Sequence, residues 1–368
     1  MTEAQGRTRF AVVGSGWRTG FFLRVAQALP EQFTATAVVT RSKETGVHIE
    51  EEWGVDTFRS LGDLPAAARP DFVVVSVPPS AAPEVIREAV ALGYPVLTET
   101  PPGGSIEALE QLYALVLDGA VIQVAEQYHL SPLLSAQISL ARSGRIGAVS
   151  QALVAQCHDY HGVSVIRRAL GIGFEDAEID ASSFRYSMIQ GPTRAGDPAA
   201  EEYQQVNQIS ARLDFGSRLG LYEFAPEQYR SWIRSNRLLV RGDRGEIKDS
   251  EIRSLQDFRT PMFTSIRRIS TGEGGNMEGH YLRGLVAGDQ WVYRNRFAPA
   301  RLFDDEIAVA TCLARMKEHI DGGPELYSLA EAAQDFYLSQ LIKESARTGR
   351  AVHSEPQAWS EWALPLQS

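Results

Sequence analysis

The sequence predicts two domains of different class: an N-terminal α/β domain with a doubly wound parallel sheet, and a C-terminal α+β domain with an open, largely antiparallel β-sheet. In the first third of the chain, short apolar runs alternate with stretches of helical periodicity. From Val149 onward, apolar and polar residues alternate between hairpin-like turns. A length of 368 residues suits two hydrophobic cores of roughly 100 to 200 residues each.

The first domain, residues 1–130, shows apolar segments with helical segments between them. Strands are expected over residues 9–13, 33–40, 71–77, 95–98 and 121–125, and helices over residues 21–29, 43–53, 83–92 and 106–117. This order builds right-handed βαβ crossovers, which give one parallel sheet with helices on both faces.

The second domain, residues 131–368, begins with a helix over residues 135–143. Alternating runs predict strands over residues 150–155, 208–215, 219–224 and 231–241, and the turns at 215–218 and 241–245 are typical of hairpins. Two long amphipathic helices over residues 304–320 and 329–348 end at glycines. Whether these helices pack back on the first domain stays open.

Charge and composition exclude several classes of protein. The formal net charge of −10 opposes the basic surface that nucleic-acid binding needs. No apolar run approaches the roughly 18 residues of a membrane span, and the N-terminus lacks a signal-peptide pattern, so we expect a cytoplasmic protein without a membrane partner. Cys157 and Cys312 are far apart, and the seven histidines show no metal-ligand spacing, so no metal is expected.

A glycine motif in the first domain indicates a dinucleotide site. Gly14-Ser15-Gly16 directly follows the first strand, where glycines let the backbone approach a pyrophosphate. This is the turn of a Rossmann domain, although Thr19 stands where a third glycine is usual. Trp17 and Arg18 complete the turn; whether Arg18 contacts a phosphate or solvent stays open. The motif therefore predicts a nicotinamide dinucleotide as the cofactor.

The end of the second strand bears on the choice between NAD and NADP. An acidic residue there would accept hydrogen bonds from the ribose 2′-hydroxyl of NAD. The strand instead ends at Thr40 and Arg41, a hydroxyl and a guanidinium that suit a 2′-phosphate. The sequence therefore slightly favours NADP over NAD.

Seven short motifs in order give the chain a resemblance to the Gfo/Idh/MocA family of NAD(P)-dependent sugar and cyclitol oxidoreductases. They are Gly14-Ser15-Gly16-Trp17-Arg18, Val75-Ser76-Val77-Pro78, Val96-Leu97-Thr98-Glu99-Thr100-Pro101, Gln127-Tyr128-His129-Leu130-Ser131-Pro132, Ser143-Gly144-Arg145-Ile146-Gly147, Gly242-Asp243-Arg244-Gly245 and Ser345-Ala346-Arg347-Thr348-Gly349-Arg350. The resemblance implies cofactor contacts at Val77, Pro78, Glu99, Thr100, Pro101 and Gln127, with a cis bond expected before Pro101.

One departure from the family concerns catalysis. Glu99-Thr100-Pro101 stands where the family has Glu-Lys-Pro, whose lysine helps to move the substrate's hydroxyl proton. A threonine hydroxyl has no positive charge and does not titrate near neutral pH, so it cannot replace an ammonium in that role. Another group must therefore handle the proton.

The resemblance assigns that proton to His161, at the place of the family's histidine near the start of a helix. The family's aspartate position holds Cys157, but the loop between adds His158 and Asp159, which could orient His161 or share the proton. Tyr128 and His129 follow the fifth strand at the edge where doubly wound sheets bind ligands, and the resemblance places them beside nicotinamide and substrate.

For the substrate, we expect hydrogen-bonding and aromatic side chains that match a hydroxyl-rich molecule. Tyr186, Gln190 and Arg194 are the candidates. The leading hypothesis is hydride transfer to or from a sugar, a sugar derivative or a cyclitol. A glycoside hydrolase or lyase that oxidises its substrate transiently is the alternative, and a non-catalytic cofactor-binding protein is the third possibility. An uncovered face of the second sheet predicts a homo-oligomer, a dimer or tetramer.

Overall fold

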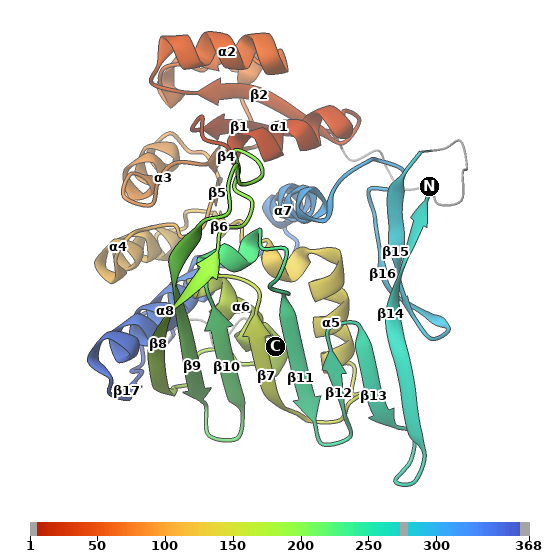
Figure 1. Ribbon diagram of the computed structural model, residues 1–368. Helices are drawn as coiled ribbons and strands as arrows, with labels where there is room; N and C mark the ends of the chain where they lie inside the picture. The colour runs from red at the N-terminus through yellow and green to blue at the C-terminus, as the bar shows by residue number, and fades with distance from the viewer. Residues whose placement is uncertain (1–5, 273–278, 361–368) are drawn as a thin grey trace. The chain divides into compact units, whose positions relative to one another are not determined.

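The computed structural model describes residues 6–272 and 279–360, and the chain divides into two compact units (Figure 1). Unit 1 comprises Met1–Pro132, Ile269–Gly284 and Arg294–Ala333, and unit 2 comprises Leu133–Arg268, Leu285–Tyr293 and Gln334–Ser368. In the described part of the chain, no helix has the length and apolar character needed to span a membrane.

Unit 1 contains a parallel sheet with the strand order β3-β2-β1-β4-β5-β6. Its strands are β1 (Thr8–Val13), β2 (Phe33–Val39), β3 (Thr57–Phe58), β4 (Phe72–Val75), β5 (Val96–Thr98) and β6 (Ile122–Val124). The helices α1 (Thr19–Ala28), α2 (Lys43–Trp53), α3 (Ala82–Ala91) and α4 (Ile106–Leu117) connect them. This order reverses between β1 and β4, which is the doubly wound topology that the sequence predicts.

A buried glutamine fixes a later segment of the chain to the edge of this sheet. The side-chain oxygen of Gln123 in β6 accepts hydrogen bonds from the backbone N–H groups of Leu326 and Tyr327, at 2.9 and 3.0 Å. The N–H of Val124 donates to the carbonyl of Tyr327 at 2.9 Å. Helix α7 (Asp304–Ile320) also belongs to unit 1, where Arg24 of α1 forms an ion pair with Glu306 at 2.8 Å.

Within the described residues, the second sheet has eleven strands in the order β16-β15-β14-β13-β12-β11-β7-β10-β9-β8-β17. Strand β7 pairs with β10 in parallel, and the neighbouring pairs from β8 to β14 are antiparallel. The strands are β7 (Val149–Ala155), β8 (Glu178–Ile189), β9 (Tyr203–Asp214), β10 (Leu219–Phe224), β11 (Arg237–Gly242), β12 (Gly245–Lys248), β13 (Glu251–Leu255), β14 (Pro261–Thr271), β15 (Tyr281–Ala287), β16 (Gln290–Arg294) and β17 (Val352–His353).

The two faces of this sheet have different environments in unit 2. Helix α6 (Asp159–Leu170) packs on β7 and β10, and a Cβ at Gly220 of β10 would lie 2.6 Å from the Ile166 side chain. Side chains alternate along a strand, so Tyr222 faces α6 while Glu223 points to the opposite face. That opposite face includes the exposed Phe184 of β8. The predicted open, largely antiparallel sheet is therefore confirmed.

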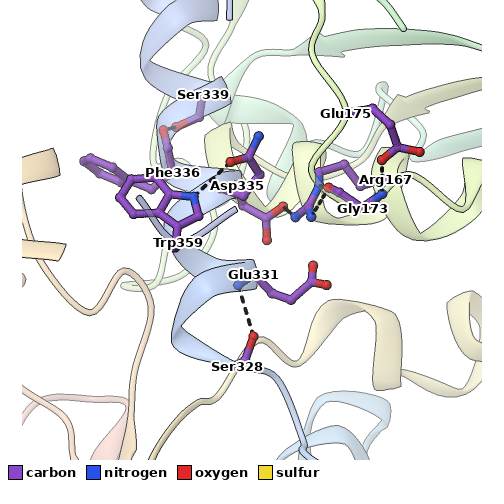
Figure 2. Close-up of polar contacts among 10 residues, drawn as sticks. Arg167, Gly173, Glu175, Ser328, Glu331, Asp335, Phe336, Ser339 and Trp359 are labelled. Atoms are coloured by element: carbon purple, nitrogen blue, oxygen red, sulfur yellow. Dashed lines mark hydrogen bonds and ion pairs between the residues drawn. The ribbon is translucent and has the colours of Figure 1, made fainter. Parts of the chain in front are cut away.

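A buried ion pair joins α6 to α8 (Leu329–Thr348) in unit 2 (Figure 2). The guanidinium Nη1 of Arg167 lies 2.6 Å from Oδ1 of Asp335, and the two side chains are only 1% and 3% exposed. Arg167 also donates through Nε to the carbonyl of Gly173 at 3.0 Å. Further along, the indole N–H of the fully buried Trp359 donates to Gln334 at 2.9 Å.

The predicted elements agree with the structure except in three places. Residues 231–236 are not part of a strand, because a 3-10 helix, η4 (Pro226–Tyr229), follows β10 and β11 begins only at Arg237. Strand β9 begins at Tyr203, well before the predicted start at residue 208. Helix α5 (Pro132–Arg142) begins three residues before the predicted start, with proline in the first turn as that position allows.

Candidate functional site

The turn after β1 requires glycine at one position and leaves the backbone open at another. Gly14 has a φ of +124°, and a Cβ there would lie 2.0 Å from the carbonyl oxygen of Ser76. At Gly16, a Cβ would have no heavy atom of the described residues within 4 Å. The backbone before α1 therefore leaves open space at Gly16, where a helix N-terminus favours an anion.

Several predicted cofactor residues lie at the carboxyl ends of the parallel strands. Val77 and Pro78 follow β4, Glu99 and Thr100 follow β5, and Gln127 follows β6. The Thr100–Pro101 peptide bond is cis, as predicted. Ligands of doubly wound sheets bind at this edge, so the topology brings these residues to one side of unit 1.

The end of β2 is connected to the glycine turn by hydroxyl groups. The buried Thr40 hydroxyl donates to the Ser15 hydroxyl at 3.2 Å, while Arg41 is exposed. Arg59 donates through Nη1 to the carbonyl oxygens of Thr40 and Ser42, at 2.7 and 2.9 Å. Arg59 therefore adds a second guanidinium at this strand end. Its role was not predictable, because Arg59 lies outside every motif.

Arg18 makes a contact that differs from both interpretations left open by the sequence. Its guanidinium lies 2.9 Å from the carboxylate of Glu99, and the two side chains are 16% and 13% exposed. The guanidinium also lies 4.7 Å from the centre of the Phe21 ring, within the range of a cation–π interaction. The glycine turn and the segment after β5 are thus joined by a partly buried ion pair.

The segment after β6 forms a short 3-10 helix, η3 (Tyr128–Leu130). The N–H of Tyr128 donates to the buried carboxylate of Glu126 at 3.2 Å, and the His129 ring lies 5.3 Å from the Tyr327 ring. The side-chain oxygen of Gln127 is buried without a hydrogen-bond donor among the described residues. A buried acceptor of this kind fits a ligand that brings its own donor, such as a carboxamide.

In unit 2, aromatic and imidazole rings gather at the start of α6. The phenolic oxygen of Tyr229 lies 2.5 Å from Nδ1 of His158 and accepts from the His158 N–H at 3.0 Å. The His161 ring, 4% exposed, has its centre 4.9 Å from that of His158, and the Tyr160 ring lies 4.4 Å from His161. The structure therefore brings together His158 and His161, two of the three histidines that the sequence selected.

Asp159 is held between a tyrosine and a lysine. Its N–H donates to the Tyr222 phenolic oxygen at 2.9 Å, its backbone has a φ of +45°, and its carboxylate lies 2.9 Å from Nζ of Lys343 in α8. Burial raises the pKa of the Tyr222 hydroxyl far above its ordinary value. A Cβ at Gly162 would lie 2.4 Å from the Tyr222 ring, so glycine there lets this ring pack against α6.

Sequence reasoning missed Lys343 and Tyr222. Lys343 lies in the last long helix, far along the chain from the histidine loop, and only the packing of α8 brings it to Asp159. Tyr222 lies at a buried position of a strand in which buried and less buried residues alternate, and nothing in its sequence context distinguishes it from a core residue. No motif could have identified either residue.

Two of the three predicted substrate residues, Tyr186 and Gln190, make contacts outside this cluster. Tyr186 lies on the sheet face opposite α6, since it lines a cavity together with Glu223. Gln190 donates to the carboxylate of Glu202 at 3.3 Å, and Arg194 is exposed in the turn between Thr193 and Gly196. Their role in substrate binding stays a prediction.

Comparisons with known proteins agree on the fold. Residues 8–125 match the model of the GFO_IDH_MocA oxidoreductase family, NAD-binding Rossmann fold. A comparison with curated proteins gives no match. Among solved structures, GenD2 from gentamicin A biosynthesis, in complex with NAD, is 19% identical with a TM-score of 0.66, and the match covers 96% of this chain and 98% of GenD2.

Two further structures are similar over nearly the whole chain. A putative myo-inositol dehydrogenase from Sinorhizobium meliloti 1021 is 16% identical with a TM-score of 0.65, covering 94% of this chain and 99% of its own. Levoglucosan dehydrogenase, in complex with NADH and levoglucosan, is 14% identical with a TM-score of 0.67, covering 95% and 100%. At these identities the structures establish a shared fold. Residues 8–125 therefore belong to the Gfo/Idh/MocA oxidoreductase family, and the chain as a whole shares the fold of these proteins.

Proposed function

We propose that the protein is an NAD(P)-dependent oxidoreductase that transfers hydride between the nicotinamide and a sugar, a sugar derivative or a cyclitol. The turn at Gly14 is the observation that carries this proposal. Its backbone conformation requires glycine, and the turn belongs to residues 8–125, which match the oxidoreductase family. The similar structures include a putative myo-inositol dehydrogenase and levoglucosan dehydrogenase, which supports a hydroxyl-rich substrate.

The residues of unit 1 fit a dinucleotide. The open backbone at Gly16 would receive the pyrophosphate, and the buried oxygen of Gln127 would accept from the carboxamide. Trp17, Val77, Pro78, Glu99, Thr100 and Pro101 are the further proposed contacts. When bound, the cofactor supplies the hydride acceptor or donor.

We further propose NADP as the preferred form. The exposed Arg41 follows the buried Thr40, and Arg59 bonds the backbone on both sides of Arg41. Two guanidinium groups at this strand end suit a 2′-phosphate, and no carboxylate directly follows β2. Measuring kcat/KM with NAD and with NADP tests this preference: a higher value with NAD contradicts it.

His161 is the proposed general acid and base. An imidazole changes its protonation near neutral pH, so it can take the proton from a hydroxyl that is being oxidised and return it in reduction. His158, with Nδ1 at Tyr229, and Asp159, neutralised by Lys343, are proposed to orient it. Tyr128 and His129 are proposed to contact the reacting groups from unit 1.

Thr100 favours a second candidate, a glycoside hydrolase or lyase that oxidises and then re-reduces its substrate. Thr100 stands in place of the lysine that ordinary dehydrogenases of this family use. Incubation of the purified chain with polyols and glycosides separates the candidates. Net formation of reduced cofactor supports the dehydrogenase, and product without net cofactor change supports the hydrolase or lyase. If neither result is observed, the non-catalytic protein is supported.

Substitution of His161 tests the proton role. His161→Gln should lower kcat by roughly 10²- to 10⁴-fold, because an amide cannot exchange a proton near neutral pH. Cofactor affinity should not change, since the glycine turn belongs to unit 1. His48→Gln, an exposed histidine on α2, is the matched control. Unchanged kcat in the His161 variant would remove this residue from the mechanism.

We also propose a homo-oligomer, a dimer or tetramer, that forms through the open face of the second sheet. Phe184 is 64% exposed on that face, and the half-buried Leu153, Leu221 and Leu239 share it by strand register. Apolar side chains grouped on one open face are typical of an interface.

A further inference from the structure

A cavity of about 310 Å³ lies in unit 2, on the sheet face opposite α6. Its walls come from β8, β9, β10, η4, β11 and the segments on either side of η4. Glu223 lines the cavity while its neighbours Tyr222 and Phe224 contact the start of α6, so the two sites occupy opposite faces of β10. The cavity is thus separate from the proposed catalytic loop.

Part of the cavity lining is apolar or aromatic. Met188 and Ala225 line it and pack with the fully buried Val206 in a small cluster that also includes Tyr186. The Tyr186 ring stacks on Phe184, with ring centres 5.7 Å apart and an angle of 22° between planes. Tyr186 therefore presents a rigid, flat surface.

Polar groups of both signs surround this surface. Glu223 forms an ion pair with Arg237, and the guanidinium of Arg234 lies 5.9 Å from the Tyr186 ring centre. Gln208, Gln228 and Ser235 add amide and hydroxyl groups. The two carboxylates and two guanidiniums of the lining balance in charge, which favours a neutral ligand with many hydroxyl groups over an ion.

One residue of the lining has a carboxylate oxygen without a hydrogen-bond donor among the described residues. Oε2 of Glu227 is buried, and no donor among residues 6–272 and 279–360 forms a hydrogen bond with it. A buried carboxylate oxygen without a donor is costly, and a ligand hydroxyl would remove that cost. Glu227 belongs to η4, which also contains Tyr229, the partner of His158.

We propose that this cavity is a second binding site, specific for a hydroxyl-rich ring such as a monosaccharide or cyclitol. The apolar face of the ring lies on Tyr186, and its hydroxyl groups donate to Glu227 and bond the amides and the ion pair around it. The volume lies at the lower end of the range for small-molecule sites, which suits one ring. Binding here requires neither the cofactor nor turnover.

The test is a titration of the full chain, without nicotinamide cofactor, with myo-inositol and with D-glucose, followed by ligand-observed NMR. We expect saturable binding of at least one ring. Glu227→Gln, which keeps shape but not charge, should weaken it roughly 10- to 100-fold. Tyr186→Leu should weaken it too, and the matched control Glu88→Gln, an exposed residue of α3, should not. Thermal unfolding of each variant checks that it is folded.

Three results would overturn the proposal. The first is that neither the unmodified chain nor the Leu239→Asp variant shows saturable binding. This variant is included because it should prevent a second copy from covering the open face of the sheet. The second is binding that His161→Gln abolishes and Glu227→Gln leaves unchanged, which would place the ring at the catalytic loop. The third is Glu227-dependent binding of propylammonium but of neither ring. Turnover assays test the proposed function separately, so either proposal can fail alone.

Discussion

Gly14 and Gly16 lie two positions apart in the turn after β1, yet their surroundings differ. Gly14→Ala should destabilise unit 1 by at least ~1–3 kcal/mol, because the backbone conformation is strained for alanine and its Cβ would overlap Ser76. Gly16→Ala should leave the melting temperature unchanged or slightly raised, since its Cβ enters open space and alanine restricts the unfolded chain. Differential scanning fluorimetry measures both effects.

Cofactor titrations show whether glycine at position 16 is required for cofactor binding, separately from its effect on stability. If the pyrophosphate lies against Gly16, the folded Gly16→Ala chain binds NAD(P) more weakly than the unmodified chain. Equal affinities would show that the cofactor does not lie against this turn, and the description of the fold of unit 1 would be unaffected. Gly104→Ala, at another glycine of unit 1 without a close neighbour, is the control for a general effect of the added methyl group.

Tyr222 makes the stability of unit 2 depend on alkaline pH. In the unfolded chain the phenol has a pKa of about 10, whereas burial raises the pKa in the folded chain. Above about pH 10 the unfolded chain releases this proton and the folded chain retains it, so the free energy of unfolding falls as pH rises. At neutral pH, Tyr222→Phe should cost about 1–3 kcal/mol, because the Asp159 N–H loses its acceptor.

Urea unfolding between neutral pH and pH 11 tests this prediction. The Tyr222→Phe chain should lose stability less steeply above pH 10 than the unmodified chain does. Tyr203→Phe, at a tyrosine that is 67% exposed, should follow the unmodified chain. Parallel curves for all three chains would show that the Tyr222 proton makes no contribution.

At the scale of elements, the Arg167–Asp335 ion pair holds α6 to α8. Asp335→Asn should cost about 3–5 kcal/mol, because it removes the carboxylate charge that pairs with a buried guanidinium. Glu318→Gln breaks the exposed pair with Arg296 and should cost less than about 1 kcal/mol. Chemical denaturation of both variants makes the comparison, and similar losses for the two would contradict the role of burial.

The elements that the sequence predicted well are those whose burial determines their pattern. Strand β4 is buried along its whole length and reads as a continuous apolar run, and α7 and α8 have the predicted bounds. Strand β8 was not predicted, because exposed polar residues on both of its faces interrupt the apolar pattern. The apolar Trp232 and Ile233 suggested a strand, but both are exposed in the segment after η4.

The candidate site was predictable only where a local motif defines it. The glycine turn, the cis bond before Pro101 and the histidine loop are all local in sequence. The pairs Arg18–Glu99 and Asp159–Lys343 depend on tertiary packing between distant segments, and no spacing in the sequence encodes them. Tyr186 was selected for its chemistry, and strand register then placed it on the face opposite α6.

At the scale of the whole molecule, the open face of the second sheet predicts self-association. Its half-buried leucines and the exposed Phe184 would gain hydrophobic free energy if a second copy covered them. Light scattering at micromolar concentration should give a mass two or four times that of one chain.

Leu239→Asp should reduce the mass toward that of a single chain, because it places a charge on this face, while circular dichroism confirms the fold. Leu92→Asp, at an exposed leucine of unit 1, should keep the full mass. A single-chain mass for the unmodified protein, or equal dissociation by both variants, would contradict assembly through this face.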